Sequence, residues 1–238
     1  MENDTSVFLG ALPWVIVAII AGILGCIALY QGNYRKFFAS SLFVKAIMWL
    51  PLYVIFWLAS YSLISSSVFA LLVAIGSVYE WKRHGKLSVG WYLIYFLIGC
   101  VMVPVSLSVL GPRLWMAVLM AAVLSDVTAF FAGKALGRHR LPASLNDQKS
   151  IEGVIGQIVG GFIGISITSG LFNVAAPGSV GLFIGLLCAG GDLMNSFIKR
   201  KLHINDWGHT IPGHGGVMDR FSSLYVALIG TTLLFIFR

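Results

Sequence analysis

The chain has 238 residues, of which 58% are hydrophobic and only 11% are charged, and its mean hydropathy is +0.90. Because soluble globular domains carry about 25% charged residues, this composition excludes a soluble enzyme and favours a membrane protein. The three cysteines, Cys26, Cys100 and Cys188, lie in apolar runs without the spacing of a metal or redox motif. The net charge of +7 therefore indicates membrane topology and headgroup contact, and we expect no nucleic acid partner.

Eight apolar segments are long enough, at about 20 residues each, to cross a bilayer as helices. The boundary between the second and third segments rests only on Tyr61 and a few nearby serines. We therefore predict an all-α, polytopic membrane helix bundle of about eight transmembrane helices. In chain order the segments are 7–30, 41–60, 62–80, 89–110, 114–134, 153–175, 179–198 and 220–237.

Basic residues predict the orientation of this bundle. We number the loops between the predicted spans in chain order. Of the 16 Lys and Arg residues, 14 lie in or beside the odd-numbered loops, and the exceptions are Arg113 and Arg238. Since cytoplasmic loops carry an excess of Lys and Arg, we expect these loops in the cytoplasm and both termini on the non-cytoplasmic side. Two of the cytoplasmic loops, 134–152 and 199–219, are long, polar and rich in glycine, so we expect the functional site beside them.

Asp126 is one of two acidic residues in the interior of the predicted spans. A lone carboxylate in hydrocarbon costs on the order of 3 kcal/mol or more, so it needs a polar cavity or a partner. Ala122, Asp126, Ala129 and Gly133 share one helical face of small residues, which lets another helix approach closely. This segment alone leaves two readings open, a helix-packing stripe and a functional carboxylate.

Asp192 is the other acidic residue in the interior of a predicted span. It forms one polar stripe with Asn195, Ser196 and Lys199, which follow it at helical spacing. Basic side chains that reach for the membrane surface explain Lys199 and its basic neighbours. They do not explain Asp192, which lies at least one turn deeper, and for this residue we favour a function.

The loop after this stripe combines a glycine-rich turn with a carboxylate. Residues 212–216 read Pro-Gly-His-Gly-Gly, a run whose backbone N–H groups can form an anion-binding nest. Asp219 follows at the start of the last span. Carboxylates bind Mg²⁺, while nests, Lys and Arg bind phosphates, so this stretch predicts a site for a nucleoside triphosphate. The chain contains no P-loop motif GxxxxGK[ST].

These segments resemble the signature of the phosphatidate cytidylyltransferases, also called CDP-diacylglycerol synthases. The family pattern S-x-x-K-R, K-D, P-G-H-G-G and D-R-x-D is similar to SFIKRKLHINDWGHTIPGHGGVMDRF, and the preceding G-D-L-x-x-S is similar to GGDLMNS. The segments DVTAFFAGKALGRHRL and KSIEGVIG, which flank and include the loop 134–152, are also similar to family motifs. The residues that match the main signature are Ser196, Lys199, Arg200, Asp206, Pro212, Gly213, His214, Gly215, Gly216, Asp219 and Arg220.

The resemblance covers about residues 126–223, and the N-terminal half agrees only as apolar spans. We therefore divide the chain into an N-terminal transmembrane bundle, 1–112, and a C-terminal catalytic region, 113–238. Two positions depart from the family pattern: Asn205 stands where the family has Lys, and Ser222 where it has the last acid. Because serine is a weak cation ligand, the second change bears on a second cation site.

The resemblance implies a Mg²⁺-dependent integral membrane enzyme that condenses CTP with phosphatidate, or a related lipid phosphate, at the cytoplasmic face of the membrane (the inner membrane if the source is bacterial). Asp192 and Asp219 would hold Mg²⁺ and act in catalysis with Lys199 and Arg200. A homodimer among membrane lipids is also implied. The remaining residues expected to bind CTP and its phosphates are Asp126, Lys149, Glu152, Ser196, Asp206, Gly213, His214, Gly215, Gly216 and Arg220.

Three alternatives stay open. The first is a CTP-dependent kinase of a polyprenol or phytol, or a cytidylyltransferase with another lipid acceptor. The second is a transporter or channel with Asp126 and Asp192 along its path, although the polar residues gather at one face. The third is a catalytically dead relative that acts as a scaffold, or a family member with weakened activity, and the changes at Asn205 and Ser222 would suit either.

Overall fold

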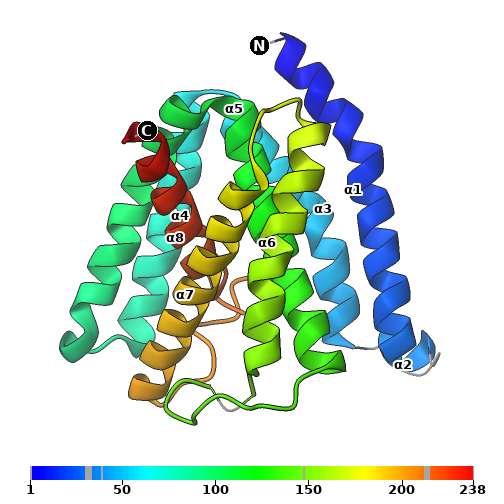
Figure 1. Ribbon diagram of the computed structural model, residues 1–238. Coiled ribbons are helices and arrows are strands. Elements are labelled where there is room, and N and C mark those ends of the chain that lie inside the picture. Colours follow the sequence, from blue (N-terminus) through cyan, green and yellow to red (C-terminus); the bar gives the residue numbers. More distant parts are fainter. Residues whose placement is uncertain (1, 30–33, 39, 147, 212–214, 238) are drawn as a thin grey trace.

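The computed structural model describes residues 2–29, 34–38, 40–146, 148–211 and 215–237, and in them every regular element is helical (Figure 1). Strand pairing in the described residues is limited to two isolated bridges, 140 with 150 and 211 with 215. The elements are α1 (Glu2–Leu29), α2 (Tyr34–Phe38), α3 (Ser41–Ser60), α4 (Leu63–His84), the 3-10 helix η1 (Leu87–Val89), α5 (Gly90–Ala135), α6 (Ile151–Leu171), α7 (Gly178–Leu202) and α8 (Val217–Ile236).

The predicted all-α fold class is confirmed. Within the described residues, six helices (α1 and α4 to α8) are long and apolar enough to cross a membrane, and α3 contains a shorter apolar stretch, Ala46–Ser60. These helices indicate an integral membrane protein. The count of eight crossings and the side of the membrane on which the termini lie stay predictions.

Helix α5 is not one straight rod, because Gly111 interrupts it with φ 71° and ψ 161°. The indole N–H of Trp115 donates to Ser106 Oγ at 2.8 Å. Residues nine apart in a straight helix are separated by about 13.5 Å along the axis, so this bond requires the chain to fold back at Gly111. The reversal lies where the sequence separates the segments 89–110 and 114–134.

The boundary at Tyr61 is also confirmed. Ser62 and Ser65 form a reciprocal capping box: the Ser65 N–H donates to Ser62 Oγ at 3.0 Å, and the Ser62 N–H donates to Ser65 Oγ at 2.9 Å. Such a box satisfies two N–H groups at a helix start. Two local features were not predicted, since α2 forms inside the expected loop 31–40 and α4 continues to His84.

Small residues allow α6 to pack closely against α5 and α7. A Cβ added at Gly161 would lie 2.4 Å from the Gly181 carbonyl oxygen of α7, and one at Gly164 would lie 2.7 Å from Ala121 Cα of α5. The predicted small face that includes Gly133 packs on α6, where a Cβ at Gly133 would lie 3.7 Å from Gly153 Cα. This packing brings the polar residues of three helices together.

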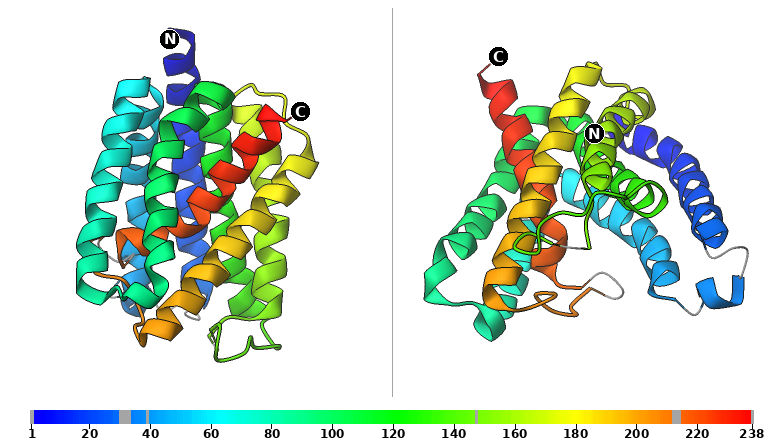
Figure 2. Two further views of the ribbon diagram at one scale, coloured as in Figure 1. Left: turned by 90° about the vertical axis from the view of Figure 1, so that its left-hand side faces the viewer. Right: turned by 60° about the horizontal axis from the view of Figure 1, so that its bottom comes forward.

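The described parts of the α5–α6 and α7–α8 connections lie at the same end of the bundle, opposite the two chain ends (Figures 1 and 2). At one side of the bundle, α1 lies at the periphery beside α3 (Figure 1) and exposes apolar side chains, with Trp14 and Leu24 each 61% exposed. The polar connections therefore meet over α5 to α8, while α1 has the character of a lipid-facing helix.

Candidate active site

A cavity of about 410 Å³ opens among α5, α6, α7, α8 and the α5–α6 connection. Seven of the predicted site residues line it, and they come from α5, α7, α8 and this connection. The cavity therefore brings together chain segments that are almost one hundred residues apart. The seven are Asp126, Lys149, Asp192, Ser196, Lys199, Asp219 and Arg220.

Asp219 lies in the first turn of α8, and its carboxylate has three donors. The Lys199 ammonium lies 2.6 Å from Oδ1, and the backbone N–H groups of Trp207 and Gly216 donate to Oδ2 at 2.8 and 3.0 Å. The side chain is only 2% exposed. Gly215, with φ 83°, makes the turn before it. The carboxylate is thus held in one orientation at the edge of the cavity.

Asp192 pairs with the second lysine of the site. Lys149 Nζ lies 2.5 Å from Asp192 Oδ2 and 3.3 Å from the Asp192 carbonyl oxygen. Lys149 belongs to the α5–α6 connection and Asp192 to the middle of α7. This ion pair therefore fastens the connection over the cavity.

Asp126 lies among α5, α6 and α8. Its Oδ1 accepts a hydrogen bond from Gln157 Nε2 at 2.7 Å, and its Oδ2 accepts one from Ser223 Oγ at 3.4 Å. The carboxylate therefore has polar partners on two other helices and also lines the cavity. The structure is compatible with both readings of Asp126, a packed polar contact and a ligand-binding group.

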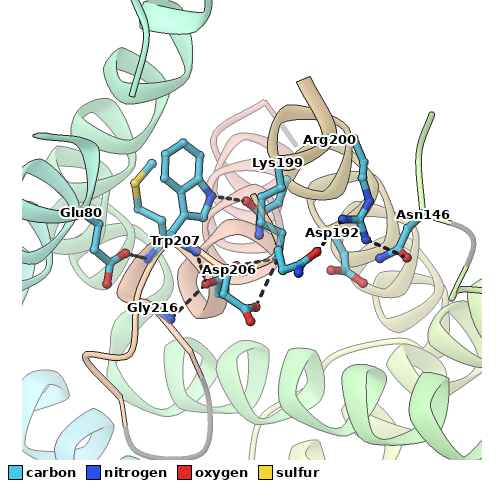
Figure 3. Close-up of polar contacts among 12 residues, drawn as sticks. Glu80, Asn146, Asp192, Lys199, Arg200, Asp206, Trp207 and Gly216 are labelled. Carbon is cyan, nitrogen blue, oxygen red and sulfur yellow. Dashed lines mark hydrogen bonds and ion pairs between the residues drawn. The ribbon is translucent and has the colours of Figure 1, made fainter. Parts of the chain in front are cut away.

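Arg200 is held at the mouth of the site, although it is not among the residues that line the cavity. Its guanidinium donates to Asn205 Oδ1 at 3.0 Å and to Asn146 Oδ1 at 3.4 Å, and Asn146 does line the cavity (Figure 3). Asn205, one of the two departures from the family pattern, thus orients this cation. Asp206 lies nearby, with Oδ1 3.8 Å from Lys199 Nζ.

Other predicted residues lie outside the cavity lining. Glu152 contacts His139 instead, with Oε1 2.6 Å from Nδ1 and 3.2 Å from the backbone N. Gly215 and Gly216 lie behind Asp219, and the N–H of Gly216 is bonded to that carboxylate. The rest of the predicted nest, Pro212, Gly213 and His214, falls outside the described residues.

Ser222 is buried, and its Oγ makes no hydrogen bond within the described residues. It is not among the residues that line the cavity, whereas Ser223 is. Its carbonyl oxygen accepts a hydrogen bond from Tyr95 OH at 2.9 Å. The backbone of residue 222 thus contacts the first half of α5, and the side chain adds no cation ligand to the cavity lining.

Two important residues were absent from the predicted site. Asn195 lines the cavity, and its Oδ1 accepts hydrogen bonds from Tyr92 OH at 2.9 Å and from Trp207 Nε1 at 2.8 Å. Glu80 of α4 reaches the start of α8 from the other side of Trp207 (Figure 3). The polar stripe through Asp192 gave a signal for Asn195, but nothing in the sequence indicates a partner for Glu80.

The donor set of the cavity fits Mg²⁺ only with help from a ligand. Asp192 and Asp219 are two carboxylates on one cavity, and no group of three or more His, Cys, Asp or Glu side chains in the described part of the chain could hold a metal ion. Mg²⁺ in enzymes is commonly bound by one or two carboxylates together with substrate phosphates and water. The residues present are consistent with that mode.

Comparison with known proteins agrees with this chemistry. A model of the cytidylyltransferase family matches residues 4–237. A phosphatidate cytidylyltransferase of Rickettsia bellii is 33% identical over 201 residues, which cover 76% of this chain and 80% of that protein. One of Helicobacter pylori is 40% identical over 130 residues, 52% of this chain and 47% of that protein, so the chain spans about half the length of this relative.

Proposed function

The chain belongs to the cytidylyltransferase family, and from this premise we propose that it transfers the cytidylyl group of CTP to phosphatidate, giving CDP-diacylglycerol and pyrophosphate. One observation carries the reaction class: two lysine–carboxylate pairs, Lys149–Asp192 and Lys199–Asp219, line the same cavity among membrane-type helices. We place the reaction at the cytoplasmic face of the membrane, where the basic loops are expected.

In the proposed reaction a phosphate oxygen of phosphatidate attacks the α-phosphorus of CTP. A new P–O bond forms, the bond between the α-phosphorus and the bridging oxygen breaks, and pyrophosphate leaves with that oxygen. The nucleophile is already an anionic phosphate, so the chain needs no Ser or Cys nucleophile. Its task is to position two anionic substrates and to stabilise the charge that develops on the leaving group.

The basic residues of the cavity suit this task. Lys149, Lys199 and Arg220 line the cavity, and Arg200 stands at its mouth. We assign the phosphates to these four cations, with Ser196 as a neutral donor. Asp206, Asp126, Glu152 and the glycine turn with Gly213 and His214 keep supporting roles on the nucleotide side as predictions from the resemblance.

Asp192 and Asp219 would hold Mg²⁺ on the cavity wall. When bound, the ion would neutralise charge on the triphosphate and on the leaving pyrophosphate. A second cation gains no support from position 222, because Ser222 is not among the residues that line the cavity. The homodimer rests on the resemblance alone and stays a prediction.

The test uses the purified protein in lipid nanodiscs that contain phosphatidate. CTP labelled in its α-phosphate should transfer label to the lipid in the presence of Mg²⁺, and CTP labelled in its γ-phosphate should release labelled pyrophosphate. Transfer of the γ-label to an added polyprenol would support the kinase alternative instead. If neither label reaches a lipid in folded protein, the enzymatic proposal is wrong.

The same assay tests the two carboxylates. Asp192→Asn and Asp219→Asn remove the charge and nearly preserve shape, so each should reduce turnover by at least about 100-fold through loss of charge stabilisation. Asp4→Asn is the matched control, because Asp4 pairs with Arg113 away from the cavity. Normal turnover in either test variant would remove that residue from the site.

A further inference from the structure

Glu80 lies near the end of α4 and is 1% exposed. Its Oε1 accepts the Val217 N–H at 2.7 Å, and its Oε2 accepts the Met218 N–H at 2.9 Å. The Thr210 hydroxyl also donates to Oε1. Glu80 therefore joins α4 to both the α7–α8 connection and the first turn of α8, although these lie more than one hundred residues later.

These contacts satisfy a need that α8 cannot meet alone. The first N–H groups of a helix have no partner within the helix, and an anionic group near them is stabilised by the helix dipole. Glu80 supplies two acceptor oxygens there from a different helix. The approach is so close that a Cβ added at Gly216 would lie 2.6 Å from Glu80 Oε2.

The same part of α4 also holds the loop that reaches Asp219. The indole rings of Trp81 and Trp207 are stacked, with centroids 5.7 Å apart and an interplanar angle of 24°. The backbone N–H of Trp207 donates to Asp219 Oδ2, and Val217 and Met218 directly precede Asp219. Glu80 and Trp81 thus hold the two segments that fix this carboxylate. Figure 3 shows Glu80 beside Trp207.

We propose that Glu80 is a positioning residue, which sets the place of the Asp219 carboxylate by fastening the first turn of α8. It touches neither substrate nor metal and acts through the backbone of Val217 and Met218. This inference rests on the proposed function, because it assumes that Asp219 serves Mg²⁺ and CTP. It extends the site into the N-terminal half of the chain, where the sequence indicates only membrane spans.

Glu80→Gln tests the proposal. Glutamine keeps the size but offers one acceptor oxygen and one amino group, so one of the two backbone N–H groups meets another donor. Loss of a group that orients a metal ligand typically costs about 10- to 100-fold in activity or metal affinity. We expect kcat to fall by that factor and the half-saturating Mg²⁺ concentration to rise, while KM for phosphatidate stays within about twofold.

The Mg²⁺ readout separates positioning from mere stability. A variant that folds poorly contains less active protein, but its active fraction keeps the wild-type half-saturating Mg²⁺ concentration. Glu80→Asp retains two acceptor oxygens and should recover part of the lost activity. Ser77→Ala is the matched control, because Ser77 is buried on α4 and, among the described residues, its hydroxyl donates to the Val73 carbonyl of the same helix. An unchanged Mg²⁺ response in Glu80→Gln overturns the proposal.

A second measurement does not need turnover. Mn²⁺ can replace Mg²⁺ as a spectroscopic probe, and its CTP-dependent binding can be followed by electron paramagnetic resonance in the same samples. If wild type binds Mn²⁺ with CTP but makes no CDP-lipid, the proposed reaction fails and the positioning role is decided by Mn²⁺ affinity in Glu80→Gln. We expect about 10-fold weaker binding; equal binding would contradict the role of Glu80.

Discussion

The shared oxygen of Asn195 gives a prediction that can be worked out in free energy. The indole N–H of Trp207 can only donate, so the atom that faces it must be the amide oxygen of Asn195. Tyr92 OH donates to the same oxygen. Asn195→Leu keeps the approximate volume but leaves both buried donors without this acceptor. Each unsatisfied buried donor costs about 1–3 kcal/mol, so unfolding should become easier by about 2–6 kcal/mol.

A double-mutant cycle tests this assignment. Tyr92→Phe alone removes one hydrogen bond and should cost about 0.5–1.5 kcal/mol. In the Asn195→Leu background the same change removes an unsatisfied hydroxyl, so it should be neutral or stabilising. The two substitutions should therefore couple by at least about 1 kcal/mol. The free energy of unfolding can be measured in mixed micelles with a denaturing detergent, followed by tryptophan fluorescence.

Tyr95→Phe is the matched control for this cycle. Tyr95 lies one turn further along α5, but its hydroxyl donates to the Ser222 carbonyl and not to Asn195. Its effect should add to that of Asn195→Leu within about 0.5 kcal/mol. Equal coupling for Tyr92 and Tyr95, or additivity of Tyr92→Phe with Asn195→Leu, would refute the shared-acceptor reasoning.

Two further predictions concern the ion pair and the helix packing. Lys199→Met leaves the Asp219 carboxylate buried without its cation, so the free energy of unfolding should fall by about 3–5 kcal/mol and CTP turnover should be lost. Lys201→Met changes an exposed lysine and should alter stability and turnover little. Equal effects at the two lysines would contradict a special role for Lys199. Gly161→Ala places a methyl group 2.4 Å from the Gly181 carbonyl oxygen and should destabilise the bundle by about 1–3 kcal/mol. Thermal unfolding in detergent measures this change. An unchanged melting temperature would show that α6 and α7 can move apart without cost.

The helices were predictable because their sequence signals are local. An apolar run of sufficient length, a Ser62–Ser65 cap and a Gly-Pro pair at 111–112 each mark an element or a boundary within a few residues. The clustering of Asp192, Lys199 and Asp219 was also predictable, since the polar stripe and the following loop are adjacent in sequence. Because only 11% of the residues are charged, these charged side chains stand out in the sequence.

The missing parts of the site depend on contacts between distant segments. In the sequence, Glu80 is simply an acid at the end of an apolar span. Two of the groups that donate hydrogen bonds to its carboxylate are backbone N–H groups, which have no sequence signature. Glu152 is the opposite case, because the family motif predicts that it binds the nucleotide, whereas in the structure its carboxylate contacts His139. Whether residue 222 faces the cavity depends on the rotation of α8, which its sequence alone does not determine.

The balance of charge in the cavity bears on how its ligands can enter. Five basic side chains and three acidic ones line it, so the walls carry a formal surplus of only two positive charges. A nucleoside triphosphate and a phosphomonoester together bring more negative charge than that. The protein alone therefore leaves the filled site anionic, and the remaining compensation must arrive with the substrates. We expect nucleotide affinity to depend steeply on divalent cation and much less on monovalent salt, as for a site that admits CTP already complexed with its counterion.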